Sequence, residues 1–460
     1  MTDSYINASQ DCKRKMKIEF SAIGGYSEVG MNMCAFKIGE EVVICDMGFY
    51  LPEVVRLQDE EIVKTNLTRE ELIHLHVIPN DEVIRDWKNK VKAIVLPHCH
   101  LDHTGAVPYL AEYYDCPIYG APYTLEVLKS ILKDEGVRLK NKLRILNGND
   151  SVKISENITL EFLSIPHSTP QTMLAAFHTP EGIILYGNDF KFDNNPTLGP
   201  KPNYKRMAEL GEIGVKALIC DALYAHEEMK TPSELVAKEM LKDVMLGIEN
   251  TDKLVIVTTF ASHIARLKSI IEFGKKMDRK IVILGRSMNK YITAAENIQL
   301  VNFSRDAIIA KYGDQVRKKL LEINKNPGKY LVICTGHQGE PRSILMRIAT
   351  KELPYEFRQG DQVIFACKVI PAPINIANRA AMEAKLKQKG VRLFKDIHTS
   401  GHLAREDHHD LIDLVKPKHI IPAQGDITIL NSLADLAEEL GYERNKTVHV
   451  LKNGDTILLE

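Results

Sequence analysis

The sequence predicts an α/β protein: an αββα sandwich of two helix-covered sheets, interrupted by a domain with an open parallel sheet flanked by helices. In the first half of the chain, short apolar strands joined by hairpins outnumber the helices. From about residue 230, strand, loop and helix alternate, which is typical of a parallel sheet. The hairpin-rich pattern returns after residue 391, so we expect domain limits of 1–220, 221–390 and 391–460, with the middle part inserted.

The first and last parts of the chain supply the strands of the sandwich. Turns at Gly39-Glu40 and Glu181-Gly182 are predicted to close hairpins. Apolar residues with helical spacing predict helices at 80–88, 106–114 and 122–135. The predicted strands lie at 15–23, 33–38, 41–45, 92–96, 158–163, 173–178, 183–186, 391–396, 419–422, 447–451 and 456–459.

The inserted part contains buried apolar strands that alternate with amphipathic helices. Helices are predicted at 263–277 and 290–299. Open parallel sheets bind ligands beyond the carboxyl ends of their strands, so we expect function in the loops that follow them. The predicted strands lie at 254–259, 280–284, 330–334 and 362–367.

Composition excludes several classes of protein. With 44% hydrophobic and 26% charged residues, the chain can bury a full core, which excludes disordered and fibrous proteins. A net charge of -1 excludes a histone-like polycation, so a nucleic acid would need a local basic cleft. No apolar run approaches a membrane span and residues 1–17 lack a signal-peptide core, so we expect a cytoplasmic protein without membrane contact. The eight cysteines form no C-x-x-C pair and are expected to be buried, without disulfides.

The strongest local signal is a cluster of polar residues directly after the predicted strand 92–96: His98, His100, Asp102 and His103. Such a cluster is unfavourable in a core and typical of a metal site. In an extended segment His98 and His100 point the same way and can bind one cation, while Asp102 and His103 face a neighbouring position. Paired cations about 3.5 to 4 Å apart are used on phosphodiesters. Imidazole and carboxylate suit zinc, and manganese remains an alternative.

Three more residues stand at strand ends where further ligands would be needed. His167 follows the strand ending near 165, and Asp189 follows the strand 183–186. Each alone would usually be structural, but together with the cluster both are predicted ligands. Asp189 is the natural bridge, because one carboxylate can bind two cations. Asp46 ends the strand 41–45 and is expected to orient a ligand or its loop.

These motifs together resemble a known family. The order Asp46, His98-x-His100-x-Asp102-His103, His167, Asp189 resembles the metallo-β-lactamase fold, and the inserted domain resembles its nucleic-acid-processing β-CASP branch. Asp221 and His402 match two further motifs of that branch. The chain from about residue 16 onward is similar to ribonuclease J, in the shorter archaeal form without a further C-terminal domain. The segments that carry this are Asp189-Phe190-Lys191-Phe192-Asp193, Thr259-Phe260-Ala261-Ser262, Gly285-Arg286-Ser287-Met288 and Gln338-Gly339-Glu340-Pro341.

The resemblance implies a two-zinc ribonuclease in RNA decay or maturation. It would act as a 5′-to-3′ exonuclease on single-stranded RNA, with internal cutting as a second activity. His98, His100 and His167 would hold one zinc ion, Asp102 and His103 the other, and Asp189 both. His402 would protonate the leaving oxygen while oriented by Asp221, and Asp102 would be essential for catalysis. We also expect a homodimer.

One position departs from the family pattern. Its RNA enzymes have a histidine as the third extra motif, where this chain has Gln424 within Ile420-Ile421-Pro422-Ala423-Gln424-Gly425-Asp426. An amide oxygen is a weaker zinc ligand than an imidazole nitrogen. We therefore predict Gln424 as a ligand of a weak second site, which favours manganese or magnesium. The alternative is that Gln424 is turned away and Asp426 replaces it.

The loops of the inserted domain predict a phosphate site. Ser262, Arg286 and Ser287 follow strands that we expect to be neighbours, and a guanidinium with hydroxyls suits the terminal 5′ phosphate of RNA. Arg286 in a surface ion pair is the alternative. Ser400 and Gly401, together with His402, are also predicted to contact RNA.

Other functions and other histidines stay open. A DNA nuclease of the same family and a hydrolase of small esters are alternative enzymes, although a small substrate needs no inserted domain of this size. An RNA-binding platform with an impaired metal site is the non-catalytic alternative. The remaining histidines are predicted as solvated (His74, His76), on a helix surface (His408, His409) or divided between RNA contact and structure (His263, His337).

Overall fold

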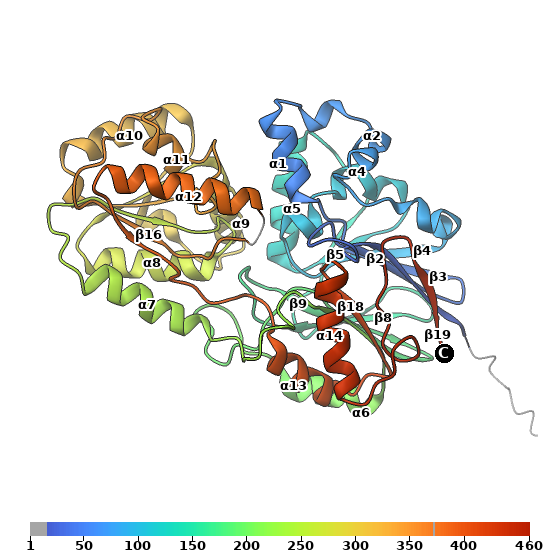
Figure 1. Ribbon diagram of the computed structural model, residues 1–460. Helices are drawn as coiled ribbons and strands as arrows, with labels where there is room; N and C mark the ends of the chain where they lie inside the picture. Colours follow the sequence, from blue (N-terminus) through green and yellow to red (C-terminus); the bar gives the residue numbers. More distant parts are fainter. Residues whose placement is uncertain (1–15, 371–372) are drawn as a thin grey trace, which may run out of the picture.

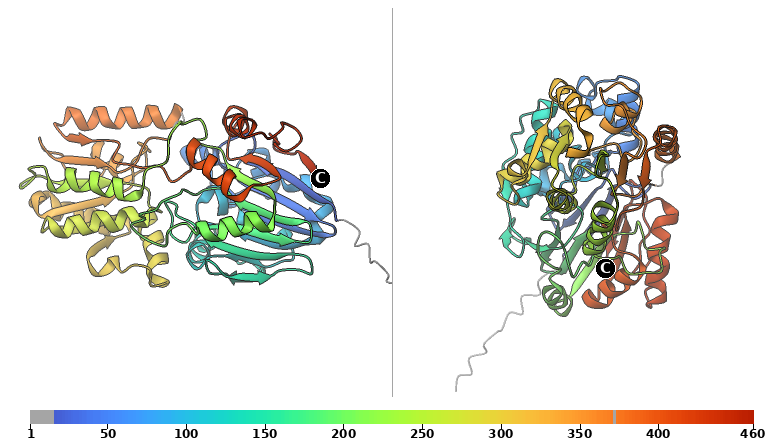
Figure 2. Two further views of the ribbon diagram at one scale, coloured as in Figure 1. Left: turned by 90° about the horizontal axis from the view of Figure 1, so that it is seen from below. Right: turned by 90° about the vertical axis from the view of Figure 1, so that its left-hand side faces the viewer.

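The computed structural model describes residues 16–370 and 373–460, which form two lobes (Figure 1). The larger lobe contains two stacked sheets with helices on both outer faces, and the smaller lobe contains a third sheet from the middle of the chain (Figure 2). Within the described residues, no helix has the length and apolar character that a membrane span requires.

The first sheet of the larger lobe has the strand order β19-β1-β2-β3-β4-β5-β6. It is antiparallel from β19 to β3 and parallel from β3 to β6. The predicted hairpin between β2 and β3 turns at Gly39, whose φ of 57° favours glycine. The strands are β1 (Ile18–Gly24), β2 (Met33–Ile38), β3 (Glu41–Cys45), β4 (Val91–Leu96), β5 (Ile118–Gly120), β6 (Leu143–Ile145) and β19 (Thr456–Leu459).

The second sheet has the order β18-β11-β10-β9-β8-β7 and faces the first. Alternate side chains of both sheets form the core between them, where the rings of Phe36 and Phe177 lie 4.7 Å apart. The strands β10, β11 and β18 run parallel, so their carboxyl ends share one edge. The strands are β7 (Ser151–Lys153), β8 (Thr159–Ser164), β9 (Met173–Thr179), β10 (Gly182–Gly187), β11 (Val215–Asp221) and β18 (His419–Ala423).

Helices cover the two outer faces of this sandwich, which confirms the αββα layering (Figure 1). The predicted helix 80–88 is the 3-10 helix η2 (Asp81–Lys90), and 106–114 is a short α-helix followed by a 3-10 turn. The first sheet is covered by α1 (Leu51–Asp59), η1 (Lys64–Asn66), α2 (Arg69–His74), η2, α3 (Leu101–Thr104), α4 (Val107–Leu110), η3 (Ala111–Tyr113) and α5 (Pro122–Glu135), and the second by α6 (Tyr204–Ile213), α13 (Arg405–Val415) and α14 (Ile427–Glu439).

The third sheet is parallel throughout, as predicted, with the order β14-β13-β15-β12-β16-β17. Its strands are β12 (Val255–Thr258), β13 (Lys280–Leu284), β14 (Ala307–Ala310), β15 (Tyr330–Cys334), β16 (Gln362–Phe365) and β17 (Arg392–Phe394). One face packs on α7 (Glu234–Leu246), α8 (Ile264–Lys276) and α9 (Arg286–Asn297), and the other on α10 (Gly313–Lys325), α11 (Ile344–Ala349) and α12 (Pro373–Gln388), with the 3-10 helices η4 (Phe303–Arg305) and η5 (Pro327–Lys329) in the connections.

Three sequence predictions about this fold are wrong. β17 pairs with β16, so the inserted sheet extends past the predicted limit at residue 390. The segment 447–451 lies beside β18 but bridges to it only at Val448 among the described residues, so it is not a strand. β15 separates β12 from β13, so the loops after these two strands are not neighbours.

The described cysteines are free and buried as predicted: Cys34, Cys45, Cys99, Cys116, Cys220, Cys334 and Cys367. Cys12 lies outside the described residues.

A buried ion pair holds the inserted lobe near its junction with the larger one. Arg266 of α8 is fully buried, and its guanidinium binds both carboxylate oxygens of Glu234 at the start of α7. The same guanidinium donates to the carbonyls of Ala366 and Ile397, at 2.7 and 3.1 Å. Burial alone would raise the pKa of Glu234, but Arg266 and His263 hold it well below its usual range. Arg266 therefore joins two helices to the chain that returns to the larger lobe.

We expect Arg266→Met to lower the free energy of unfolding by about 3 to 5 kcal/mol, because the charge of Glu234 stays buried without its partner. Adding Glu234→Gln should recover part of this loss, since it removes the unpaired charge. Urea denaturation followed by circular dichroism measures both values. Arg56→Met, at an exposed helix pair, is the control and should leave stability unchanged. Equal stabilities of Arg266→Met and Arg56→Met would contradict the assignment.

Candidate metal centre

The predicted cluster after β4 folds into a loop and one helical turn. His98 and His100 lie in the loop, and both belong to one group of candidate ligands. Asp102 and His103 lie on α3 and belong to a second, adjacent group. The rings of His98 and His100 are 5.1 Å apart, and one ring nitrogen of each belongs to the same group of candidate ligand atoms. The six-residue motif thus supplies ligands to two adjacent groups.

The first group contains three imidazoles and the carboxylate of Asp189, which follows β10. Asp189 Oδ2 lies 3.5 Å from His98 Nε2, 4.0 Å from His100 Nδ1 and 3.8 Å from His167 Nε2. One ligand atom from each of the four residues lies within 4.8 Å of all the others. Three nitrogens and one oxygen at this spacing form a donor set that can hold a divalent cation.

The second group shares Asp189 and adds the two residues of α3. His103 Nε2 lies 3.3 Å from Asp189 Oδ2 and 3.6 Å from Asp102 Oδ2. Asp189 therefore stands between both groups, as the sequence predicted for the bridging carboxylate.

The chemistry of the first group fits a divalent cation. His98 Nε2 is buried and has no hydrogen-bond partner among the described residues, which is costly unless an ion binds it. Burial lowers the pKa of His98 and of His167 well below the usual value, and the neutral imidazole is the form that binds metals. His167 Nδ1 donates to the carbonyl of Gly401 at 2.7 Å, which leaves the lone pair on Nε2 directed at Asp189.

Two contacts orient the other histidines. His103 Nδ1 donates to Asp46 at 2.7 Å, and Asp46 also accepts from the hydroxyl of Tyr186 at 2.6 Å. Asp46 thus orients a ligand, which agrees with the sequence. His100 Nε2 pairs with the hydroxyl of Ser262 at 3.2 Å, so a residue of the inserted lobe orients a histidine of the larger one. Ser262 was predicted only as a phosphate contact, and this contact to His100 was missed.

His402 and Asp221 form a third set together with Asp189, in which one ligand atom of each residue lies within 4.8 Å of the others. His402 Nδ1 donates to Asp221 Oδ2 at 2.7 Å, and the rings of His402 and His167 lie 5.3 Å apart. Burial lowers the pKa of His402, but the carboxylates of Asp221 and Asp189 outweigh this effect and raise it to about 9. The raised pKa favours the protonated ring, which can donate a proton from Nε2. The ring of Tyr224 lies 5.7 Å from that of His402.

Gln424 lies at the second group, but its oxygen does not face the ligands as predicted. Gln424 Oε1 accepts a hydrogen bond from the backbone N–H of Gly30 at 2.9 Å. Its Nε2 donates to Asp189 Oδ1 at 2.9 Å and lies 3.5 Å from both Asp102 Oδ2 and His103 Nε2. An amide nitrogen has no lone pair to offer a metal. Asp426 does not replace it, because it caps the N-terminus of α14.

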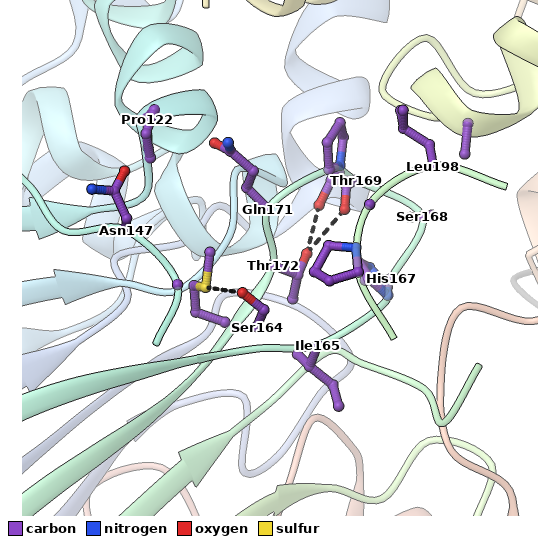
Figure 3. Close-up of a pocket in the computed structure, with 16 residues that line it drawn as sticks. Pro122, Asn147, Ser164, Ile165, His167, Ser168, Thr169, Gln171, Thr172 and Leu198 are labelled. Atoms are coloured by element: carbon purple, nitrogen blue, oxygen red, sulfur yellow. Dashed lines mark hydrogen bonds between the residues drawn. The ribbon is translucent and has the colours of Figure 1, made fainter. Parts of the chain in front are cut away.

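A cavity of about 140 Å³ opens beside His167 (Figure 3). Its wall includes the polar side chains of Asn147, Ser168 and Gln171, which the figure shows around the open space. Thr169 and Thr172 hydrogen-bond to each other at 3.0 Å and shape the turn that follows His167. His167 thus borders this polar cavity, although its side chain is only 1% exposed.

Comparison with known proteins identifies the family. Models of the ribonuclease J β-CASP domain, the metallo-β-lactamase superfamily and the Zn-dependent metallo-hydrolase RNA specificity domain match residues 252–382, 83–245 and 391–451. Ribonuclease J of Methanocaldococcus jannaschii is 46% identical over 97% of this chain and 99% of its own length. Ribonuclease J of Pyrococcus abyssi is also 46% identical, over 96% and 97%. The chain belongs to the ribonuclease J family.

Bacterial members of the ribonuclease J family are more distant. Ribonuclease J 1 of Streptococcus pyogenes is 30% identical over 95% of this chain and 74% of its own length. A crystal structure of a protein of unknown function from Enterococcus faecalis covers 96% of this chain with a TM-score of 0.64 and 17% identity, which shows a shared fold.

The structure brings together most of the residues that the ribonuclease J resemblance predicted, and leaves others apart. Ser400 Oγ accepts from the backbone N–H of His402 at 3.1 Å, so it shapes the loop of the proton donor. Arg286 and Ser287 begin α9 and are exposed, with no contact to the metal cluster among the described residues. The alternative of a surface ion pair is not observed either, because Arg286 forms no ion pair with the described residues.

The remaining histidines have structural or surface positions. His74, His76 and His409 are exposed as predicted, but His408 is buried, because it lies on the inner face of α13 against the thiol of Cys220. His263 caps the N-terminus of α8, which favours the structural interpretation. His337 is buried against the ring of Phe260.

We expect Asp189→Asn to bind divalent metal at least about 100-fold more weakly, because even the groups behind metal ligands contribute about 10- to 100-fold. Asparagine keeps the shape of the side chain but removes the charge shared by both groups. Elemental analysis after dialysis measures the retained metal, with the exposed Asp413→Asn as control. Equal metal content in the two folded variants would contradict the assignment.

Proposed function

We propose that this protein is a metal-dependent ribonuclease that degrades single-stranded RNA from its 5′ end and also cuts internally. The observation that carries the proposal is the buried His and Asp cluster with the hydrogen-bonded pair of His402 and Asp221 beside it, in a chain 46% identical to two proteins named ribonuclease J. The match of residues 391–451 to an RNA specificity domain favours RNA over small esters.

The ligand sets assign the cations to the two groups. His98, His100 and His167 would hold one of them, with zinc as the proposed ion, and Asp102 and His103 would face the other, with Asp189 between. Bound divalent cations neutralise charge on the phosphoryl oxygens and make water a nucleophile near neutral pH.

The protein groups supply orientation and the proton. In the proposed reaction a water molecule gives one proton to the solvent and its oxygen forms a bond to phosphorus, while the bond from phosphorus to the leaving ribose oxygen breaks. His402 Nε2 gives its proton to that oxygen, and Asp221 stabilises the imidazolium and holds the ring through Nδ1. Ser262 acts in this scheme by orienting His100, as well as by contacting a phosphate.

Substrate contacts and setting complete the proposal. Arg286 and Ser287 would bind the terminal 5′ phosphate at the start of α9, where exposed backbone N–H groups favour an anion. Ser400, Gly401 and His402 would contact the RNA near the scissile bond. Because its proposed substrate is RNA, we place the protein in the cytoplasm. The homodimer and the cleavage of single-stranded DNA stay predictions from the sequence.

Asp102→Ala should lower RNA cleavage at least about 100-fold, because it removes one of the three ligands of the second group and leaves Asp189 and His103. The assay is digestion of 5′-labelled RNA with excess manganese, alongside single-stranded DNA and a thioester as competing substrates. Circular dichroism verifies the fold of the variant. Unchanged turnover of RNA would exclude the two-group mechanism, and faster cleavage of DNA or thioester would overturn the RNA assignment.

Arg286→Ala should lower digestion of 5′-monophosphate RNA about 10-fold or more, because a charge-assisted contact to phosphate is lost. Cutting of circular RNA, which has no 5′ end, should change far less. Arg305→Ala, at another exposed arginine of the same lobe, is the matched control. Equal loss on linear and circular RNA would place the terminal phosphate elsewhere.

A further inference from the structure

We infer that Gln424 is a hydrogen-bond donor that takes the place of a metal ligand, so that this chain retains one tightly bound divalent cation where two ligand groups are present. The inference concerns the metal centre on which the proposed function rests. It is tested by metal stoichiometry, which does not depend on RNA cleavage.

The backbone of Gly30 fixes the direction of the amide. A backbone N–H can only donate, so the Gln424 atom 2.9 Å from Gly30 N must be the oxygen. The amide nitrogen then faces Asp189 Oδ1 at 2.9 Å, which accepts one of its hydrogens. Turning the amide over would set its NH₂ against the N–H of Gly30 and its oxygen against a carboxylate. Both contacts would become repulsive, so the observed orientation is the favourable one.

The main chain also holds the residue in place. Gln424 has a φ of 65°, in the left-handed region that few side chains adopt, and it is buried. Its own N–H donates to the carbonyl of Gly25 at 2.8 Å, so the same loop holds both the backbone and the side-chain oxygen of Gln424. Glu28 and Asn453 hydrogen-bond across the base of that loop. The amide therefore cannot move aside without breaking several contacts.

The two ligand groups are consequently unequal. The first group presents three imidazole nitrogens and Asp189 Oδ2, which completes four ligands. The second presents only Asp102 and His103 beside Asp189, and Asp189 Oδ1 is already engaged by the amide hydrogens of Gln424. The NH₂ of Gln424 is the positive end of the amide dipole, and it stands where a cation in the second group would need its fourth ligand. Such a cation should bind only when it is supplied in excess.

The decisive variant is Gln424→Glu. Glutamate has the same length, keeps an oxygen as acceptor for Gly30 and replaces the NH₂ by a second oxygen that can bind a cation. Gln424→His offers an imidazole at the same place. Asp426→Asn is the matched control, because Asp426 is two residues away and caps α14 outside the cluster.

The full-length protein is loaded with zinc, dialysed against metal-free buffer and analysed for zinc per chain. We expect one ion in the unchanged protein and in Asp426→Asn, and two in Gln424→Glu and Gln424→His. Manganese titration by calorimetry should show second-site affinity at least about 10-fold higher in Gln424→Glu.

Three outcomes would overturn the inference. The unchanged protein could retain two zinc ions, Gln424→Glu could retain no more than the unchanged protein, or Asp426→Asn could lose metal. If RNA were not cleaved while the stoichiometry rose from one to two, the proposed function would fail and this inference would stand.

Discussion

The carboxylate of Asp189 is the group on which the arrangement of the larger lobe depends. Four imidazoles lie within 4.0 Å of its Oδ2, and the side chain is buried. A buried anion beside the unpaired Nε2 of His98 is costly unless a cation neutralises the anion and accepts the lone pair of that nitrogen. Metal binding and the ordering of the surrounding loops are therefore thermodynamically coupled.

The topology of the two sheets explains how residues far apart in the sequence meet at Asp189. Asp46, His98, Asp189, Asp221 and Gln424 stand at or just beyond the ends of β3, β4, β10, β11 and β18. The parallel pairing of β3 with β4, and of β10, β11 and β18, brings these ends to common edges. The sandwich core then brings the two edges together, so the fold supplies a rigid base for ligands that lie in loops.

Much of this could be predicted from the sequence, because the signals are local. The His98 to His103 motif, the hairpins and the alternation of strands and helices are each contained in a short stretch. The capping box of Thr68 and Glu71, which begins α2, was also readable but was overlooked. The contact of Ser262 with His100 and the orientation of Gln424 against Gly30 could not be predicted, since each joins segments more than 150 residues apart. The strand order that separates β12 from β13 is likewise a property of the folded sheet.

The hydrogen bond between Ser262 and His100 connects the inserted lobe to the candidate metal centre of the larger lobe. Ser168 and His167 of the larger lobe also contact His100, so the loop after β12 adds one contact to those that orient this ring. Thermodynamic reciprocity then applies: whatever free energy the Ser262 contact adds to cation binding, cation binding adds to that contact. The affinity for metal is thus coupled to the position of a loop that supplies no ligand.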